Sequence, residues 1–156
     1  LSVMLDQVLV SANRFFSTLS RGRYALRLME GPKGGNALGG LDLEVLDGAS
    51  MLPRSIETLS GGEQFLASLS LAFGLSDVVQ AHSGAVRLDA LFIDEGFGSL
   101  DGETLDVAMK ALAMLQNSGR LVGIISHVSE LKNRIPCRVE VTRDGNGLAH
   151  AGIRTQ

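Results

Sequence analysis

Hydrophobic residues near the start of the chain recur at alternating steps of four and three, which predicts a helix up to about residue 19. The pattern consists of Leu1, Leu5, Val8, Ala12, Phe15 and Leu19. This is the spacing of a coiled-coil seam, although a packed core helix gives the same short pattern. The helix begins without a cap, as though it continued from something longer, and this favours the end of a coiled coil.

A hairpin with a long tip follows. Residues 23–28 and 41–46 are strand-like, and the glycine-rich residues 31–40 lie between them. These glycines do not form a P-loop, which needs a glycine, four residues and then Gly-Lys-Ser or Gly-Lys-Thr ahead of a helix. Lys33 follows Pro32, and neither Lys110 nor Lys132 follows a glycine, so the chain contains no P-loop.

Helices and strands alternate beyond residue 51. Apolar residues at helical spacing predict helices over residues 62–80 and 101–117, and a short helix is expected near 129–134. Near-continuous apolar runs at 88–93 and 121–125 are typical of strands buried on both faces of a parallel sheet. Strands at 138–142 and 148–153 flank a strong turn signal. The pattern predicts an α/β fold with a parallel-sheet core flanked by helices, together with β-hairpins.

Composition narrows the classes of protein. The 156 residues fit one domain, and the shares of hydrophobic (45%) and charged (20%) residues are those of a globular protein. A formal net charge of -3 argues against a surface wholly devoted to nucleic acid. No apolar run approaches the ~20 residues of a membrane span. Cys137, the only cysteine, is expected to be a half-buried filler rather than a nucleophile.

The first candidate site is at residues 59–64, where a loop becomes a helix. A helix N-terminus presents unpaired N–H groups and partial positive charge, so it attracts anions. Gly61 and Gly62 let an oxyanion approach the backbone, and Ser60 is able to cap the helix or donate to a phosphate oxygen. The alternative is a simple capping box of Ser60 and Glu63. Two adjacent glycines are costly in a simple helix start, which favours a functional site.

Asp94 and Glu95 form the second candidate site, because they end a buried strand at the edge of the sheet where ligands bind in α/β folds. Asp94 would hold Mg²⁺, directly or through water, and Glu95 would polarise an attacking water. An acidic pair could instead cap the next loop, but Gly96 and Gly98 would then be unexplained.

Two further polar positions follow. Asp101 is a credible N-cap for the next helix in any protein. His127 follows the second apolar strand; a lone histidine is more often structural, but this one ends a strand that could lie beside the Asp94–Glu95 strand.

The order and spacing of these pieces resemble the C-terminal half of ABC-type ATPases, over nearly everything after Thr58. The resemblance assigns Ser60 and Gly62 to the signature motif, Asp94 and Glu95 to Walker B, and His127 to the switch. Residues 99–101 would form the D-loop.

The branch of the family is indicated by smaller features. ABC transporters usually carry proline after the Walker B glutamate and a basic residue shortly after the signature, whereas this chain has Gly96 and Phe65. The run at 92–101 and the segment at 125–136 are similar to the SbcC family, the ATPase subunits of bacterial SbcCD nucleases. Gln64 departs from that family, where many members have serine. SMC, RecN and RecF chains share the architecture and are the nearest competitors.

The resemblance implies a split active site. Residues 1–22 would be the end of the coiled coil or its root helix, and 23–156 the C-terminal lobe of the head, with the P-loop in an absent N-terminal half. Two heads would sandwich two ATP molecules. Glu95 and His127 would be catalytic, and Asp94 would bind Mg²⁺. The residues expected to contact ATP across the interface or join the two sites are Ser60, Gly61, Gly62, Glu63 and Asp101.

The resemblance also implies partners. These are the N-terminal P-loop half, a second copy of the head, an SbcD-type nuclease subunit and double-stranded DNA, with no membrane. The expected location is the bacterial cytoplasm, in association with the nucleoid. The chain alone is expected to be inactive. The alternative function is an SMC-, RecN- or RecF-like clamp that bridges DNA without a nuclease.

Overall fold

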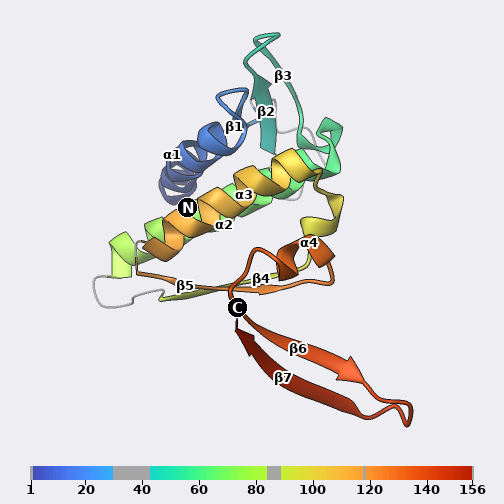
Figure 1. Ribbon diagram of the computed structural model, residues 1–156. Helices are drawn as coiled ribbons and strands as arrows, with labels where there is room; N and C mark the ends of the chain where they lie inside the picture. Colours follow the sequence, from blue (N-terminus) through green and yellow to red (C-terminus); the bar gives the residue numbers. More distant parts are fainter. Residues whose placement is uncertain (1, 30–42, 84–88, 118, 156) are drawn as a thin grey trace.

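Helix α1 (Ser2–Leu19) carries the predicted apolar stripe and packs it against helix α2 (Gly61–Ser83). The computed structural model describes residues 2–29, 43–83, 89–117 and 119–155 (Figure 1). Val8, Ala12 and Leu19 are buried. The stripe therefore serves as core packing within these residues, and the coiled coil stays a prediction.

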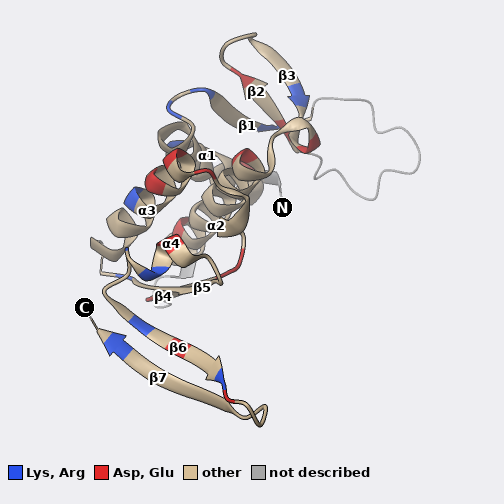
Figure 2. Cartoon of the chain, turned by 45° about the vertical axis from the view of Figure 1, so that its right-hand side comes forward, with Lys and Arg blue, Asp and Glu red and all other residues tan. Residues whose placement is uncertain are grey.

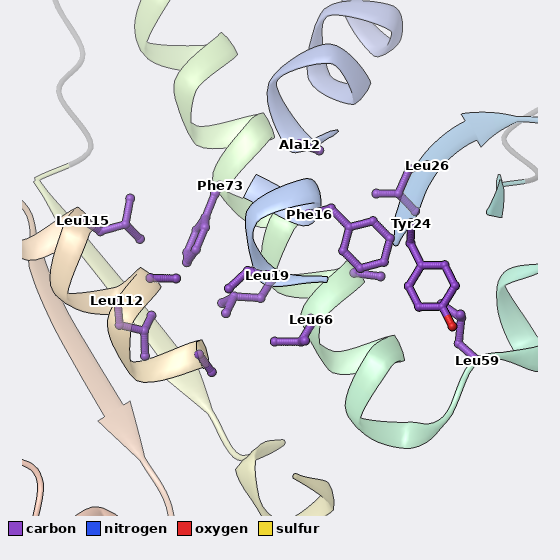
Figure 3. Packing of buried hydrophobic residues seen from close by; sticks show 14 of the residues in the cluster. Ala12, Phe16, Leu19, Tyr24, Leu26, Leu59, Leu66, Phe73, Leu112 and Leu115 are labelled. Carbon is purple, nitrogen blue, oxygen red and sulfur yellow. The ribbon is translucent and has the colours of Figure 1, made fainter. Parts of the chain in front are cut away.

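The hydrophobic core forms where α1, α2 and α3 (Gly102–Asn117) meet a small sheet. Figure 3 shows Phe16 from α1, Phe73 and Leu66 from α2, and Leu112 and Leu115 from α3 converging on this core. Helix α2 is long and apolar enough over Gly61–His82 to span a membrane by length and composition alone, a test that core helices also pass. Here it is a core helix, and its apolar composition is accounted for by packing.

Three antiparallel strands form that small sheet, in the order β1 (Tyr24–Leu28), β2 (Leu43–Asp47) and β3 (Leu52–Ser55). The predicted hairpin is thus confirmed, and its tip at 31–40 lies outside the described residues. Strand β3 was not expected, because Pro53 interrupts it. An edge strand tolerates a proline, since its N–H groups need not all pair.

The predicted parallel pair is β4 (Ala90–Asp94) and β5 (Leu121–Ile125), connected through α3. The helices lie on one side of this pair (Figure 1). On the other side Phe92, Leu121 and Ile125 are 68%, 62% and 56% exposed. The expectation that both faces are buried is wrong for this chain, because nothing among the described residues covers the second face.

A C-terminal hairpin of β6 (Cys137–Arg143) and β7 (Ala149–Thr155) follows the short helix α4 (Ser129–Lys132). It extends away from the helices (Figure 1). The Asp144 side chain holds its turn by accepting from the N–H groups of Asn146 and Leu148. Cys137 is exposed, so the prediction of a half-buried filler is wrong: no described residue covers this end of the projecting hairpin.

Candidate functional site

The N-terminus of α2 has the geometry of a capping box. The Glu63 N–H donates to Ser60 Oγ at 3.3 Å, and the Ser60 N–H donates to Glu63 Oε2 at 2.9 Å. The N–H groups of Gly61 and Gly62 precede the first helical bond, from the Gln64 N–H to the Ser60 carbonyl. The capping box thus exists, and it leaves the two glycines at the tip of the helix.

Gln64, where the sequence departs from the resemblance, holds the loop ahead of this helix. Its amide Nε2 donates to the carbonyls of Glu57 and Leu59 at 3.3 and 3.1 Å. Both acceptors lie in or beside the 3-10 turn η1 (Ile56–Thr58). A glutamine at this position therefore supports the backbone that leads into Ser60.

The second oxygen of Glu63 is bound from strand β1. The Tyr24 hydroxyl donates to Oε1 at 2.8 Å, and Arg54 Nη2 donates to the Tyr24 oxygen at 2.9 Å. Arg23 lies 3.5 Å from the same carboxylate. Partial burial opposes the charged form of Glu63, but hydrogen bonds from the Ser60 N–H and Tyr24 outweigh it and lower the pKa of Glu63. Burial, and then the Glu63 carboxylate, raise the pKa of Tyr24.

Sequence reasoning missed Tyr24 and Arg54. No short-range signal marks them, because Tyr24 is 39 residues from Glu63 and Arg54 is 30 residues from Tyr24. Tyr24 is distinguished in the sequence only as the single tyrosine, and Arg54 is one of several arginines.

The predicted D-loop lies directly against the two glycines. A Cβ on Gly61 would lie 3.5 Å from Ser99 Cβ, and one on Gly62 would lie 3.4 Å from Leu100. Asp101 caps α3, as predicted: its Oδ1 accepts the Thr104 N–H at 2.7 Å, and this bond lowers the pKa of Asp101. Both distances are ordinary van der Waals contacts, so the start of α2 and the predicted D-loop lie side by side here.

These segments border one hollow on the surface. The α1–β1 turn, the start of α2 and the start of α3 enclose it. Its lining includes five of the predicted site residues: Ser60, Gly61, Gly62, Glu63 and Asp101. The structure therefore brings together the residues that the resemblance assigns to ATP contact across an interface.

Asp94, Glu95 and His127 lie apart from this hollow, at the carboxyl ends of β4 and β5. Glu95 follows Asp94 in a left-handed conformation (φ 60°), and its N–H donates to the Ile125 carbonyl at 2.9 Å. His127 Nδ1 lies 3.0 Å from Glu95 Oε2. The expectation that the two strands lie side by side and bring these groups together is confirmed.

The Asp94 carboxylate is the predicted ligand of Mg²⁺. The described residues contain no group of three or more His, Cys, Asp or Glu side chains arranged for a metal ion. Among them, no side chain or backbone group bonds to the Asp94 carboxylate. Mg²⁺ usually takes one or two carboxylates and completes its shell with phosphate oxygens and water. A single free carboxylate at the sheet edge fits that ion when a nucleotide is present.

Basic and acidic positions are interleaved along the helices and strands (Figure 2). Most of the arginines in the described part of the chain pair with carboxylates; these ion pairs are Arg21–Glu103, Arg23–Asp47, Arg23–Glu63, Arg27–Glu44, Arg120–Asp77, Arg134–Asp106, Arg138–Glu140 and Arg154–Glu140. The arginines therefore provide no unpaired basic patch on the described surface.

Comparison with known proteins bears on both the sequence and the fold. Residues 41–114 match the family described as SbcC/RAD50-like, Walker B motif. The SbcC subunit of nuclease SbcCD from Vibrio cholerae is 57% identical over 150 residues, which is 95% of this chain. The same protein from Staphylococcus aureus is 52% identical over 140 residues, or 90% of this chain. The chain spans only 15% and 14% of the length of these relatives.

Solved structures show the same fold at low sequence identity. A structure of SMC ATPases, described in terms of ATP-driven dimerization and DNA-stimulated activation, superposes with a TM-score of 0.70 at 17% identity, covering 96% of this chain and 84% of that one. The Smc head bound to the C-winged helix domain of ScpA gives 0.69 at 20%, covering 96% and 43%. The predicted α/β fold class is confirmed: these structural neighbours are SMC ATPase heads, and the chain combines helices with a parallel strand pair and antiparallel hairpins.

Proposed function

This chain belongs to the SbcC/RAD50-like family, and on that premise we propose that it is the C-terminal lobe of an ATPase head that dimerises around ATP. In the full-length protein, hydrolysis would be coupled to DNA end processing by a nuclease subunit during double-strand break repair. The observation that carries this proposal is the Glu95–His127 contact at the ends of two parallel strands, beside the free carboxylate of Asp94.

Two groups of residues divide the work in this proposal. Glu95 accepts a hydrogen bond from the attacking water. His127 lies 3.0 Å from the Glu95 carboxylate and helps to orient that carboxylate. The hollow with Ser60, Gly61 and Gly62 contacts the ATP bound by the other head. Mg²⁺, held by Asp94, would neutralise charge on the transferred phosphate.

The uncovered side of β4–β5 supports a partner that carries the P-loop. Side chains alternate along a strand, so Phe92 and Asp94 lie on the same face of β4. Their neighbours in the register are Gly123 and Ile125 of β5, which share that face. A domain that covers this apolar face would reach its edge at Asp94. We infer that the N-terminal half of the same protein docks here and supplies the phosphate-binding loop, and that the chain alone hydrolyses no ATP.

The remaining partners rest on the names of the relatives. A nuclease subunit of the SbcD type is expected to dock near α1. Because its described arginines are mostly paired, this lobe is expected to contribute little to binding double-stranded DNA. A bacterial cytoplasmic location, associated with the nucleoid, follows from the same proposal.

Glu95→Gln in the full-length protein tests the proposal. It removes the water-polarising carboxylate but keeps the shape of the side chain, so ATP turnover should fall by about 100-fold or more. ATP-bound dimers should accumulate and be visible by size-exclusion chromatography with light scattering. Ser60→Arg is the matched comparison, because it fills the hollow and should prevent those dimers. A Glu95→Gln protein that turns over ATP normally would remove the assigned role of Glu95.

A clamp that bridges DNA without a nuclease is the second candidate, and the likeness to SMC heads favours it. Copurification from the native organism separates the two. A metallophosphoesterase-type nuclease that elutes with the full-length protein supports the first candidate, and a stable complex without nuclease activity supports the clamp.

A further inference from the structure

The turn that aims Glu95 is unusual, because two successive residues have positive φ. Glu95 has φ 60° and Gly96 has φ 94°. Glycine adopts this region freely, but for glutamate it costs on the order of 1 kcal/mol. Such a conformation persists only where the surroundings impose it. Contacts with neighbouring residues must therefore stabilise this turn.

The ring of Phe65 occupies the space beside it. A Cβ on Gly96 would lie 2.4 and 2.5 Å from two carbons of this ring. The ring meets Phe97 edge-on, with centroids 4.9 Å apart, and Phe97 is 1% exposed. Since Phe97 is held in the core, Phe65 has little freedom to move away. The Glu95–Gly96 turn is thus packed against the Phe65 side chain in the first turns of α2.

We propose that Phe65 is a positioning residue for Glu95, which rests on the proposed function of that carboxylate. The ring holds the left-handed turn, and the turn keeps the Glu95 carboxylate 3.0 Å from His127. Phe65 also lies on α2 two residues after Glu63, on the helix whose N-terminus borders the hollow.

Phe15 provides a matched control. It is half-buried, like Phe65, and its ring meets Phe73 edge-on with centroids 5.2 Å apart. Its pair lies between α1 and α2, away from the Glu95 turn. Replacing either phenylalanine by leucine removes one edge-to-face pair. Only Phe65→Leu also removes the ring that packs against Gly96.

The test uses full-length protein with Phe65→Leu, Phe15→Leu and Glu95→Gln. Phe65→Leu should lower kcat about 10- to 100-fold, because a small misplacement of a catalytic group has effects of that size. Its Kd for ATP, measured by calorimetry, should match that of the wild type. Phe15→Leu should lower the melting temperature by a similar amount and leave kcat near the wild-type value. Equal kcat values for the two leucine variants would overturn the inference.

A crystal structure of each leucine variant supplies a readout independent of activity. The Glu95 carboxylate should stay within hydrogen-bond distance of His127 Nδ1 in Phe15→Leu and leave it in Phe65→Leu. An unchanged contact in Phe65→Leu would also overturn the inference.

Glu95→Gln separates this inference from the proposed function. If Glu95→Gln abolishes turnover while Phe65→Leu does not reduce it, the inference alone fails. If Glu95→Gln turns over normally, both the role of Glu95 and the inference fail.

Gly96→Ala adds a test of the mechanism. The new Cβ would strain the backbone and meet the Phe65 ring, so kcat should fall. Combining it with Phe65→Leu should lower kcat by clearly less than the product of the two single effects, because both changes act on one turn. Strictly multiplicative effects would show that Phe65 acts elsewhere.

Discussion

Glu63 uses both oxygens of one carboxylate for different neighbours. One oxygen caps the helix through the Ser60 N–H, and the other accepts the Tyr24 hydroxyl. A simple capping glutamate would leave the second oxygen to water. The side chain therefore joins the candidate ATP-contacting loop to strand β1, which directly follows α1.

The lowered pKa of Glu63 predicts a pH-dependent contribution to stability. Because the carboxyl binds its proton less readily when folded, the unfolded state holds more protons and stability rises with pH in this range. The contribution is present above the ordinary glutamate pKa and is lost as pH falls through the lowered value. Glu63→Gln, which keeps the cap, should cost about 0.5–1 kcal/mol near neutral pH, and the difference should disappear as pH falls through the lowered pKa of Glu63.

Chemical denaturation of the full-length protein across this pH range measures the effect. Glu57→Gln is the control, since it makes the same chemical change at an exposed position ahead of the site. A difference between wild type and Glu63→Gln that persisted at low pH would show that the amide itself disturbs the cap.

The sequence predicted the residues that carry the chemistry of the site, but not the residues that hold them in position. Asp94, Glu95 and His127 each end an apolar run, and parallel strands bring such ends together. Tyr24 and Phe65 act through contacts with residues 39 and 31 positions away, and no local pattern encodes such contacts.

At the scale of elements, the crossing of α1 and α2 depends on Gly74. A Cβ there would lie 2.6 Å from backbone atoms of both Val8 and Ala12. Backbone cannot rotate out of the way as a side chain does, so the two helices would have to separate. The absence of a side chain at Gly74 thus sets their distance.

Gly74→Ala should therefore destabilise the protein even though alanine is the better helix former. Overpacking of this kind costs about 1–3 kcal/mol, which exceeds the ~1 kcal/mol gained in helix propensity. Gly102→Ala is the matched control, since Gly102 is also helical and a Cβ there meets no atom within 4 Å. Thermal unfolding should show a lower melting temperature for Gly74→Ala only; equal shifts would contradict the account.

Elements with a strong local pattern were predictable, and those defined by their neighbours were not. The long helices and both parallel strands follow from apolar spacing in the sequence. Strand β3 forms because β2 offers it a partner, with Leu46 opposite Pro53. The burial of β4 and β5 was overestimated, because an apolar run shows what a strand is able to bury and not what covers it.

At the scale of the whole molecule, the strands leave two apolar faces uncovered among the described residues. One is the free side of β4–β5. The other is one side of the hairpin, where Val139, Val141 and Ile153 are 63–74% exposed and share a face by their register. Apolar area of this kind marks an interaction surface or an aggregation hazard.

The chain on its own should therefore associate with itself as concentration rises, as measured by sedimentation velocity. Val141→Thr combined with Ile153→Thr should weaken this association, because it makes the hairpin face polar. Val10→Thr is the control, since Val10 is 68% exposed on α1 and its replacement removes similar apolar area elsewhere. A monomer at every concentration would show that these faces do not attract one another.

The projecting hairpin has a consequence for local stability. No residue of β7 is buried, and in β6 only Arg138 and Glu140 are half-buried while the others are exposed. A two-stranded ribbon without a covered face opens at little free-energy cost. Its amide hydrogens would then exchange with solvent long before those of α2 and α3, and a protease would reach it first. Docking of another domain on this ribbon would slow both reactions there while leaving the helices unchanged.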